Sequence, residues 1–201
     1  YVTESGFEEF ETVRTRVGRN MPLAQKLWLV EVATQSVREL DFSALPGIAT
    51  DPLAELRKAQ KLEPLKGQRA LRIINQGDNS GAGTMHWSAD GTQLAVQIRA
   101  IDNKDRWLGK VDFANAKLIS VHRLTDPAWI NWNFNDFGFL PDNRLWYLSE
   151  QSGYSHLYIG EGKAAKALTS GAFEASSVQW NGAGTQAYFL CNRKWPGDYE
   201  V

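Results

Sequence analysis

The 201-residue chain lacks the features on which several common kinds of functional site depend. Its single cysteine, Cys191, excludes an internal disulfide and every metal motif that needs several cysteines. No apolar run approaches the roughly 20 residues that a helix needs to cross a bilayer. The formal net charge is −1, so no overall field favours nucleic acid or an acidic membrane surface. We therefore expect no nucleic-acid partner.

Catalytic and cofactor motifs are also missing. The Gly-x-Ser-x-Gly elbow of serine hydrolases does not occur, and the glycine-rich stretch at 76–83 lacks the spacing of a phosphate-binding loop. The histidines His86, His122 and His156 are spread over predicted strands and do not form a metal-ligand cluster. We assign no catalytic residue, no metal ligand and no cofactor. Paired carboxylates of the glycosidase kind stay open, since any two of the 23 acidic residues could meet.

Three aspartates beside basic residues have a simpler interpretation. Asp102, Asp105 and Asp126 lie close in sequence to Lys104, Arg106 and Arg123. Local ion pairs or turn hydrogen bonds account for such neighbours without any chemistry. We predict a structural role for these aspartates and for the three histidines.

The chain is rich in aromatic residues, with eight Trp, nine Phe and six Tyr, and these residues favour strands. Short apolar or alternating segments separated by turn residues predict strands at 12–17, 26–32, 37–42, 69–74, 106–112, 117–124, 145–149, 156–159 and 165–169. One segment differs. Asp51 and Pro52 are typical of a helix start, and this helix should end near Lys61. It is interpreted as an insertion between sheet units, with a docking helix as the alternative.

A short pattern recurs at 85–98, at 139–148 and at 178–190. Each copy has an aromatic residue, a turn such as Asp90-Gly91 or Asp142-Asn143, and then an apolar strand. The turn requires residues that tolerate positive φ, and an apolar strand is expected to be buried on both faces. The copies lie roughly 40 to 50 residues apart, the period of four-stranded propeller blades.

The predicted fold is therefore all-β, a partial β-propeller of about three to four four-stranded antiparallel blades with one short helical insertion. The blade-like units are expected at about 1–42, 84–125, 132–170 and 176–201, with the insertion at about 51–61. Closed propellers need about four to eight blades, so we expect an open arrangement. Its free sheet edges would allow a homo-oligomer.

Three segments carry a resemblance to a known family. The most specific motifs are Ser149-Glu-x-x-Gly-Tyr-x-His-Leu-Tyr158 and, one strand later, Leu168-Thr-x-Gly-x-Phe-Glu174. Together with the run at 129–134, they resemble the N-terminal propeller region of the dipeptidyl peptidase IV family, in the prolyl oligopeptidase group of serine peptidases. The segments at 12–17 and 26–32 look like a strand pair of the same region.

The resemblance implies a parent enzyme that removes N-terminal dipeptides. In such enzymes the propeller covers a C-terminal α/β-hydrolase domain, which carries the Ser-Asp-His triad, and restricts the access of peptide substrates. We therefore expect the chain to be an excised part of a longer protein and to be inactive by itself. Its partners would be the hydrolase domain and peptide substrates. The compartment, periplasmic or cytoplasmic, stays open.

The family also holds the free amine of its substrate with a pair of glutamates. Glu8 and Glu9 are the candidate pair here, since two carboxylates suit an ammonium group. In the family, however, the pair precedes a Trp-Ser-Pro-Asp-Gly-like blade start, whereas Glu9 runs almost directly into the strand at Thr12. The alternative is that Glu8 and Glu9 lie on a solvated strand edge, with the true pair upstream of Tyr1.

Two other functions stay open from the sequence. The chain could be a stand-alone propeller-type module that binds proteins or glycans. It could also be the propeller of an acylaminoacyl-peptidase or oligopeptidase relative, whose parent would lack the glutamate pair. A Gly-x-Ser-x-Gly elbow downstream of Val201 would separate the peptidases from the binding module.

Overall fold

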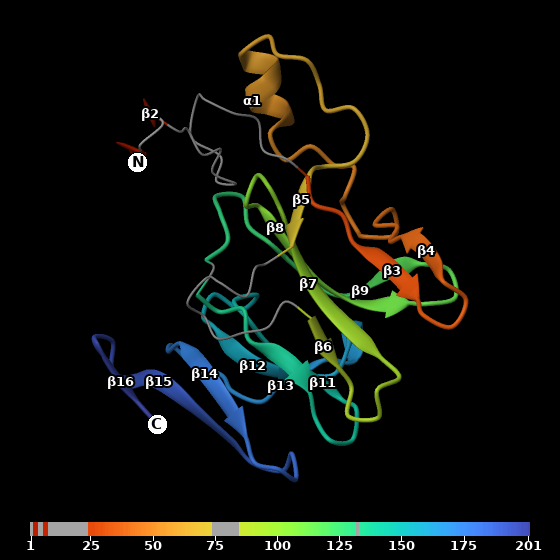
Figure 1. The fold of residues 1–201 in the computed structure, drawn as a ribbon. Helices are drawn as coiled ribbons and strands as arrows, with labels where there is room; N and C mark the ends of the chain where they lie inside the picture. Colours follow the sequence, from red (N-terminus) through yellow and green to blue (C-terminus); the bar gives the residue numbers. More distant parts are fainter. Residues whose placement is uncertain (1, 4–5, 8–23, 74–84, 132) are drawn as a thin grey trace.

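The computed structural model describes residues 2–3, 6–7, 24–73, 85–131 and 133–201 (Figure 1). Within these ranges the chain is almost entirely β-structure, with one α-helix and one 3₁₀ helix, which confirms the predicted fold class. The predicted strand at 12–17, the loop at 76–83, and Glu8 and Glu9 lie outside the described residues. The division into blade units stays a prediction.

The bounds of the elements are as follows: β1 (Val2–Thr3), β2 (Gly6–Phe7), β3 (Trp28–Glu31), β4 (Ser36–Glu39), α1 (Ala54–Ala59), β5 (Leu71–Ile73), β6 (Met85–Trp87), β7 (Leu94–Ala100), β8 (Asp105–Asp112), β9 (Lys117–Thr125), β10 (Phe137–Phe139), β11 (Leu145–Ser149), β12 (His156–Ile159), η1 (Gly162–Ala164), β13 (Lys166–Ala167), β14 (Ala175–Trp180), β15 (Ala187–Trp195) and β16 (Asp198–Glu200).

Three antiparallel sheets follow one another along the chain. The first sheet has the order β5-β7-β8-β9, and β6 pairs with the same strand, β7, as β5 does. The second sheet is the meander β10-β11-β12-β13, and the third is β14-β15-β16. The hairpin β3-β4 precedes them. Apart from β5, which pairs with β7, sequential strands within each sheet pair with each other because short turns connect them.

Apolar side chains fill the spaces between consecutive sheets. One core lies between the first sheet and the segment from the β3-β4 hairpin to Ile48. A second core joins the first and second sheets, and a third joins the second and third sheets. The first and second sheets therefore have a packed neighbour on each face. The fully buried members include Ile98, Trp107, Leu118, Leu145, Leu148 and Leu157.

The alternation of side chains along each strand explains how one strand serves two cores. In β7, Ala95 belongs to the second core, whereas its neighbour Val96 belongs to the first. In β11, Tyr147 belongs to the second core and Leu148 to the third. All five residues of β11 are buried, which confirms the prediction that this apolar strand is buried on both faces. Continuous apolar runs are typical of strands covered on both sides.

The recurring turn has the predicted backbone conformation. Gly91 has φ 70°, Asn143 has φ 65° and Gly184 has φ 66°, so the equivalent position is left-handed in all three sheets. Glycine and asparagine are the residues that adopt this conformation at least cost. The pattern in the sequence was therefore produced by a requirement of the backbone.

These turns also contact one another, and they lie at the lower end of the molecule in Figure 1. The Asn143 side-chain amide donates a hydrogen bond to the Asp90 carboxylate at 2.7 Å. Hydrogen bonds from Ser88, and then from Thr92, lower the pKa of Asp90 to about 2. At the next turn, a Cβ atom added to Gly184 would lie 2.5 Å from Cδ of Pro141. The turns thus help to fix the register of one sheet against the next.

The third sheet departs from the prediction of burial on both faces. Ala187 and Phe189 of β15 face the third core, but the alternate residue Tyr188 is 57% exposed. Trp195 and Tyr199 are also exposed. The physical reason is that no sheet in the described part of the chain covers this face. On the other side of the molecule, Trp28 and Val30 of the β3-β4 hairpin are exposed in the same way.

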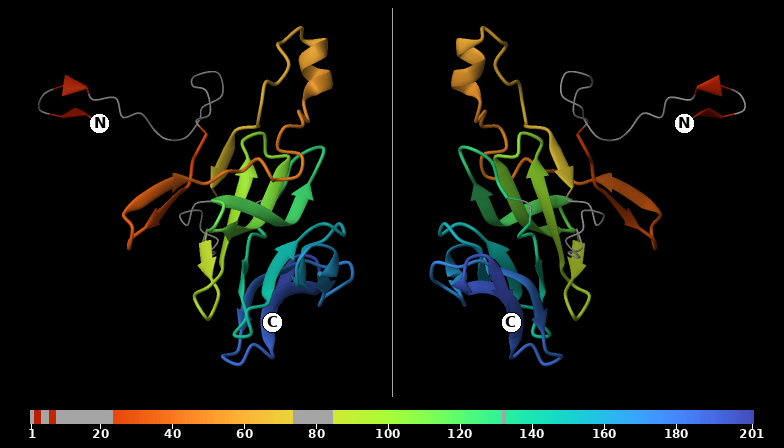
Figure 2. Two further views of the ribbon diagram at one scale, coloured as in Figure 1. Left: turned by 90° about the vertical axis from the view of Figure 1, so that its right-hand side faces the viewer. Right: turned by 90° about the vertical axis from the view of Figure 1, so that its left-hand side faces the viewer.

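The helix α1 is shorter than predicted and projects away from the sheets (Figure 2). Asp51 accepts a hydrogen bond from the Leu53 amide at 2.9 Å and pairs with Arg57 at 2.8 Å. It therefore acts two residues before Leu53, which is the N-cap, and this corrects the predicted helix start. No residue of α1 is buried, so its apolar residues, such as Leu56, face solvent.

Candidate functional site

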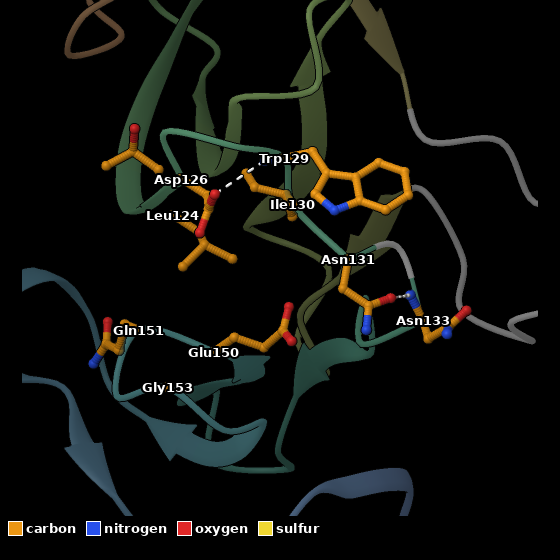
Figure 3. Close-up of a pocket in the computed structure, with 10 residues that line it drawn as sticks. Leu124, Asp126, Trp129, Ile130, Asn131, Asn133, Glu150, Gln151 and Gly153 are labelled. Carbon is orange, nitrogen blue, oxygen red and sulfur yellow. Dashed lines mark hydrogen bonds between the residues drawn. The ribbon is translucent and has the colours of Figure 1, made fainter.

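A pocket of about 720 Å³ opens between the first and second sheets, at the end of β11 opposite the recurring turns (Figure 3). The turn at Asn143 precedes β11, whereas Glu150 in the pocket wall follows it. One wall is formed by the end of β9 and the loop after it, and the other by the turn after β11. The lining residues are Leu124, Thr125, Asp126, Trp129, Ile130, Asn131, Asn133, Glu150, Gln151 and Gly153.

The loop that forms the upper wall is held by its own polar side chains. Asp126 accepts hydrogen bonds from the Ala128 amide at 2.7 Å and the Trp129 amide at 2.9 Å. The Ile130 amide donates to the Asn103 carbonyl at 2.9 Å, which ties the loop to the preceding turn. Asp126 is thus used in shaping the loop. Trp129 is 72% exposed and lines the pocket, so it offers apolar surface to a ligand.

A buried arginine joins the two sheets beside this pocket. Arg106 of β8 donates hydrogen bonds to the Phe134 carbonyl at 2.7 Å, the Asn135 side chain at 2.6 Å and the Leu148 carbonyl at 3.1 Å. Its side chain is fully buried, and burial lowers its pKa to about 10. Arg106 therefore stays protonated at neutral pH. One contact thus reaches β11 of the second sheet, and the other two reach the loop that precedes β10.

Glu150 is the carboxylate that faces the cavity, and Figure 3 shows it pointing toward the Trp129–Asn131 side. Burial raises the pKa of Glu150, the nearby charge of Glu174 adds to this, Arg106 opposes it, and Asp126 raises it slightly further. Among the described residues, the Glu150 carboxylate has no hydrogen-bond or ion-pair partner. It is a half-buried acid whose charge is poorly compensated by the protein itself.

A second carboxyl group nearby behaves similarly. Burial raises the pKa of Asp136, although backbone amides of Val178 and Ser177 and the charge of Arg106 act in the opposite direction. Asp136 is therefore paired with backbone of the third sheet, whereas Glu150 faces open space. Of these two carboxyl groups, Glu150 is the one that combines a perturbed pKa with access to the pocket, which is the combination expected of a binding residue.

The structure gives each of the three histidines a packing or hydrogen-bonding role. His122 contacts the Ser149 hydroxyl at 2.9 Å and stacks on Tyr147, and burial, together with Arg106, lowers its pKa to about 4. His156 lies between the Thr169 hydroxyl and the Gly171 carbonyl. His86 packs edge-on against a phenylalanine ring. These contacts agree with the structural role predicted for all three.

The predicted aspartate pairs are confirmed in part. Asp105 pairs with Arg123 at 2.7 Å, but the two residues are 18 positions apart, so this is not the local pair that was expected. Both Asp102 and Asp105 also bind Arg69, which sequence reasoning did not select. Arg106 takes no part in this network, because its guanidinium is directed to the second sheet. Lys104 instead donates to the Ala128 carbonyl at 2.7 Å. The network joins the start of the first sheet to its far strand.

The described residues form neither a metal-binding cluster nor a membrane-spanning helix. Across residues 24–73, 85–131 and 133–201, no group of three or more His, Cys, Asp and Glu side chains is arranged to hold a metal ion. Nor does the described part contain a helix with the length and apolar character of a membrane span. The proposed amine-binding residues Glu8 and Glu9 lie outside the described residues, so their role stays a prediction.

The pocket itself was missed from the sequence. Its residues come from two loops that are 17 or more positions apart, and the packing of the first sheet against the second brings them together. The available signal was Trp129, an aromatic residue in a polar loop directly after a strand. Loops at the ends of rigid strands are frequent places for binding residues.

Successive antiparallel sheets of three to five strands, stacked face to face and with equivalent turns in contact, define a section of a β-propeller. Comparison with known proteins then gives the family. The sequence model of the dipeptidyl peptidase IV (DPP IV) N-terminal region matches residues 73–201, and the chain belongs to this family.

Two solved structures are similar in fold. Dipeptidyl peptidase 4 of Porphyromonas gingivalis has 14% identity and a TM-score of 0.57, and the match covers 85% of this chain and 20% of that one. A Bacteroides ovatus protein described as a dipeptidyl aminopeptidase IV candidate has 15% identity and a TM-score of 0.51, with coverage of 87% and 25%. This chain thus spans a quarter or less of these relatives.

Proposed function

We propose that the chain is the non-catalytic propeller domain of a dipeptidyl peptidase IV-like serine peptidase. It gates and selects peptide substrates for a C-terminal α/β-hydrolase domain, which carries the reaction. The family match over 73–201 supports the peptidase context. The observation that supports substrate selection is the pocket at 124–133 and 150–153, which lies at one end of the stacked sheets and has an uncompensated carboxylate.

The chemistry of the pocket suits a peptide. An exposed indole ring offers apolar surface, side-chain amides of Asn131 and Asn133 offer hydrogen bonds, and Glu150 offers negative charge. A cavity of about 720 Å³ falls in the ordinary size range of ligand pockets, about 300–1,000 Å³. Binding groups of this kind select and orient a substrate, while the bond-breaking residues lie elsewhere.

Two measurements test this proposal. The chain 1–201 is expected to hydrolyse no Gly-Pro-type chromogenic substrate, because the described site offers no nucleophile with an adjacent base. The full-length protein is expected to hydrolyse such substrates and to carry a Gly-x-Ser-x-Gly elbow downstream of Val201. Turnover by stringently purified 1–201, or a full-length sequence without the elbow, would overturn the proposal in favour of a binding module.

Substrate selection is tested by substitution at the pocket rim. Trp129→Ala in the full-length protein should raise KM for peptide substrates several-fold and leave hydrolysis of a small ester unchanged, because the ester needs only the hydrolase domain. Trp28→Ala, which removes an exposed indole on the β3-β4 hairpin, is the matched control and should leave both values unchanged. Equal effects of the two substitutions would argue against a substrate-selecting pocket.

A further inference from the structure

The residues that line the pocket indicate which class of peptide it selects, if the chain has the proposed function. We propose that Glu150 makes the pocket a subsite for a positively charged side chain of the peptide, the ammonium of a lysine or the guanidinium of an arginine. The chain would then favour basic peptides over apolar peptides of the same size.

Glu150 is directed to the cavity, and its carboxylate makes no contact that holds the fold together. Its carboxylate points into the pocket, and none of the described residues pairs with it (Figure 3). The other pocket acid, Asp126, is occupied by the amides of Ala128 and Trp129. A half-buried carboxylate without a partner is costly for the folded chain, and a ligand cation would relieve that cost.

The charges around Glu150 also favour a cation as its ligand. Glu174 and Asp126 both act on Glu150 as negative neighbours, and Arg106 is the positive neighbour. Arg106, however, is fully buried, and its guanidinium is already bound to the Phe134 carbonyl, the Asn135 side chain and the Leu148 carbonyl. It therefore lowers the cost of ionising Glu150 without blocking the carboxylate. The open side of the pocket presents negative charge.

The wall of the pocket that carries Trp129 is suited to a cation as well. Trp129 leaves most of its indole ring exposed beside the cavity, and the face of an indole attracts ammonium and guanidinium groups. The aliphatic part of a lysine or arginine side chain would contact the apolar groups Leu124 and Ile130, which also line the pocket. An acid and an aromatic ring on opposite walls of one cavity fit a long side chain with a cationic end.

The same geometry fixes how binding depends on pH. A cation pairs with Glu150 only when the carboxyl is ionised, and burial raises the pKa of Glu150 above its ordinary value. Binding should therefore weaken as the pH falls through this raised pKa, at a higher pH than an ordinary glutamate would require. Reciprocally, a bound cation should lower the pKa of Glu150.

A binding experiment on the chain 1–201 tests the subsite directly. Nuclear magnetic resonance would follow the Trp129 indole N–H and the Glu150 carboxyl carbon during titration with N-acetyl-lysine methylamide, N-acetyl-arginine methylamide and the uncharged N-acetyl-norleucine methylamide. Both signals should shift with the two basic probes and not with norleucine, and Glu150→Gln should abolish the Trp129 shift. Equal shifts with norleucine, or shifts that persist in Glu150→Gln, would overturn the proposal.

Glu63→Gln is the matched control, because Glu63 is an exposed glutamate outside the pocket. This variant should bind the basic probes as the unmodified chain does. A lysine methyl ester with a free α-amine, compared with the acetylated probes, separates side-chain binding from binding of an N-terminal ammonium. If the lysine methyl ester produces shifts and the acetylated probes do not, the pocket binds the N-terminal ammonium of a peptide and the side-chain proposal is wrong.

In the full-length protein the same substitution gives a second readout. Glu150→Gln should lower the ratio of kcat/KM between a lysine-containing and a norleucine-containing peptide substrate about fivefold. Glu63→Gln, outside the pocket, should leave both this ratio and the hydrolysis of a small ester unchanged. If the full-length protein releases N-terminal dipeptides from peptides but the ratio does not change, the inference fails and the proposed function stands. If it cleaves no peptide although the basic probes still bind, the proposed function fails and the cation subsite stands.

Discussion

The second and third sheets use the same sequence pattern in two different environments. In the second sheet, β11 follows the Asn143 turn and is buried along its whole length. In the third sheet, β15 follows the Gly184 turn, and Tyr188 on its outer face is 57% exposed. This difference shows that the recurring sequence pattern specifies the strand and its turn, whereas the neighbouring sheets determine how much of the strand is buried.

The largest expected effect comes from the buried arginine in the middle of the molecule. Arg106→Ala should lower the free energy of unfolding by about 3 to 5 kcal/mol, because it removes three hydrogen bonds and leaves buried acceptors unsatisfied. Chemical denaturation measures this loss. Arg144→Ala, at an exposed pair with Asp142, should change stability by less than about 1 kcal/mol. Similar losses in both variants would contradict the role given to Arg106.

A matched pair of leucines compares the two sheets directly. Leu148 of β11 and Leu190 of β15 occupy the same position after their turns, but Leu148 is fully buried and Leu190 is half-buried. Leu148→Ala should cost about 2 to 5 kcal/mol, and Leu190→Ala about 1 kcal/mol, in the same denaturation measurement. Equal costs would mean that the third sheet is covered as completely as the second.

The turn glycines give a smaller effect with a matched control. Gly91 and Gly184 have nearly equal positive φ, so alanine should cost about 1 to 2 kcal/mol at either position. At Gly184 the new Cβ would also meet Pro141, whereas the space around Gly91 is open. Gly184→Ala should therefore unfold at a lower temperature than Gly91→Ala. The reverse order would show that the contact between the second and third turns is unimportant.

The smallest expected effect is a pH-dependent gain in stability when Glu150 is replaced by glutamine. Because the pKa of Glu150 is raised by folding, the folded chain binds more protons than the unfolded chain between the two pKa values, and its stability falls as the pH rises through that window. Glu150→Gln should therefore be the more stable form at neutral pH, and the gain should disappear in acid. Thermal unfolding from pH 4 to pH 7 measures this, and a gain that is independent of pH would refute the assigned cause.

Much of the fold could be predicted because local rules determine it. The turns at Asp90-Gly91 and Asp142-Asn143 need a left-handed residue, and the apolar runs after them need to be covered, so both appear in the sequence as a pattern. The exposure of Tyr188 could not be predicted, because it depends on what lies beyond the third sheet. The helix begins a few residues later than predicted, because the Asp51 carboxylate accepts a hydrogen bond from the Leu53 amide and pairs with Arg57.

The candidate site was less predictable than the fold. Glu150 and Trp129 belong to separate loops, and their shared cavity arises only from the packing of the first sheet against the second. The ion pairs of Arg69 with Asp102 and Asp105 are likewise separated by more than 30 positions. Spacing along the chain carries no information on such contacts. The family motif at Ser149–Tyr158 contains Glu150, but the role proposed for Glu150 depends on its burial, which the motif does not indicate.

The most direct test of the difference between the two sheets is hydrogen–deuterium exchange of the backbone amides of β11 and β15. In the chain 1–201, β11 amides should exchange slowly and β15 amides much faster, because only β11 lies between two packed neighbours. In the proposed full-length protein, β15 should become as protected as β11. Equal protection of the two strands in the chain 1–201 would contradict the account, as would a β15 strand that stays unprotected in the full-length protein.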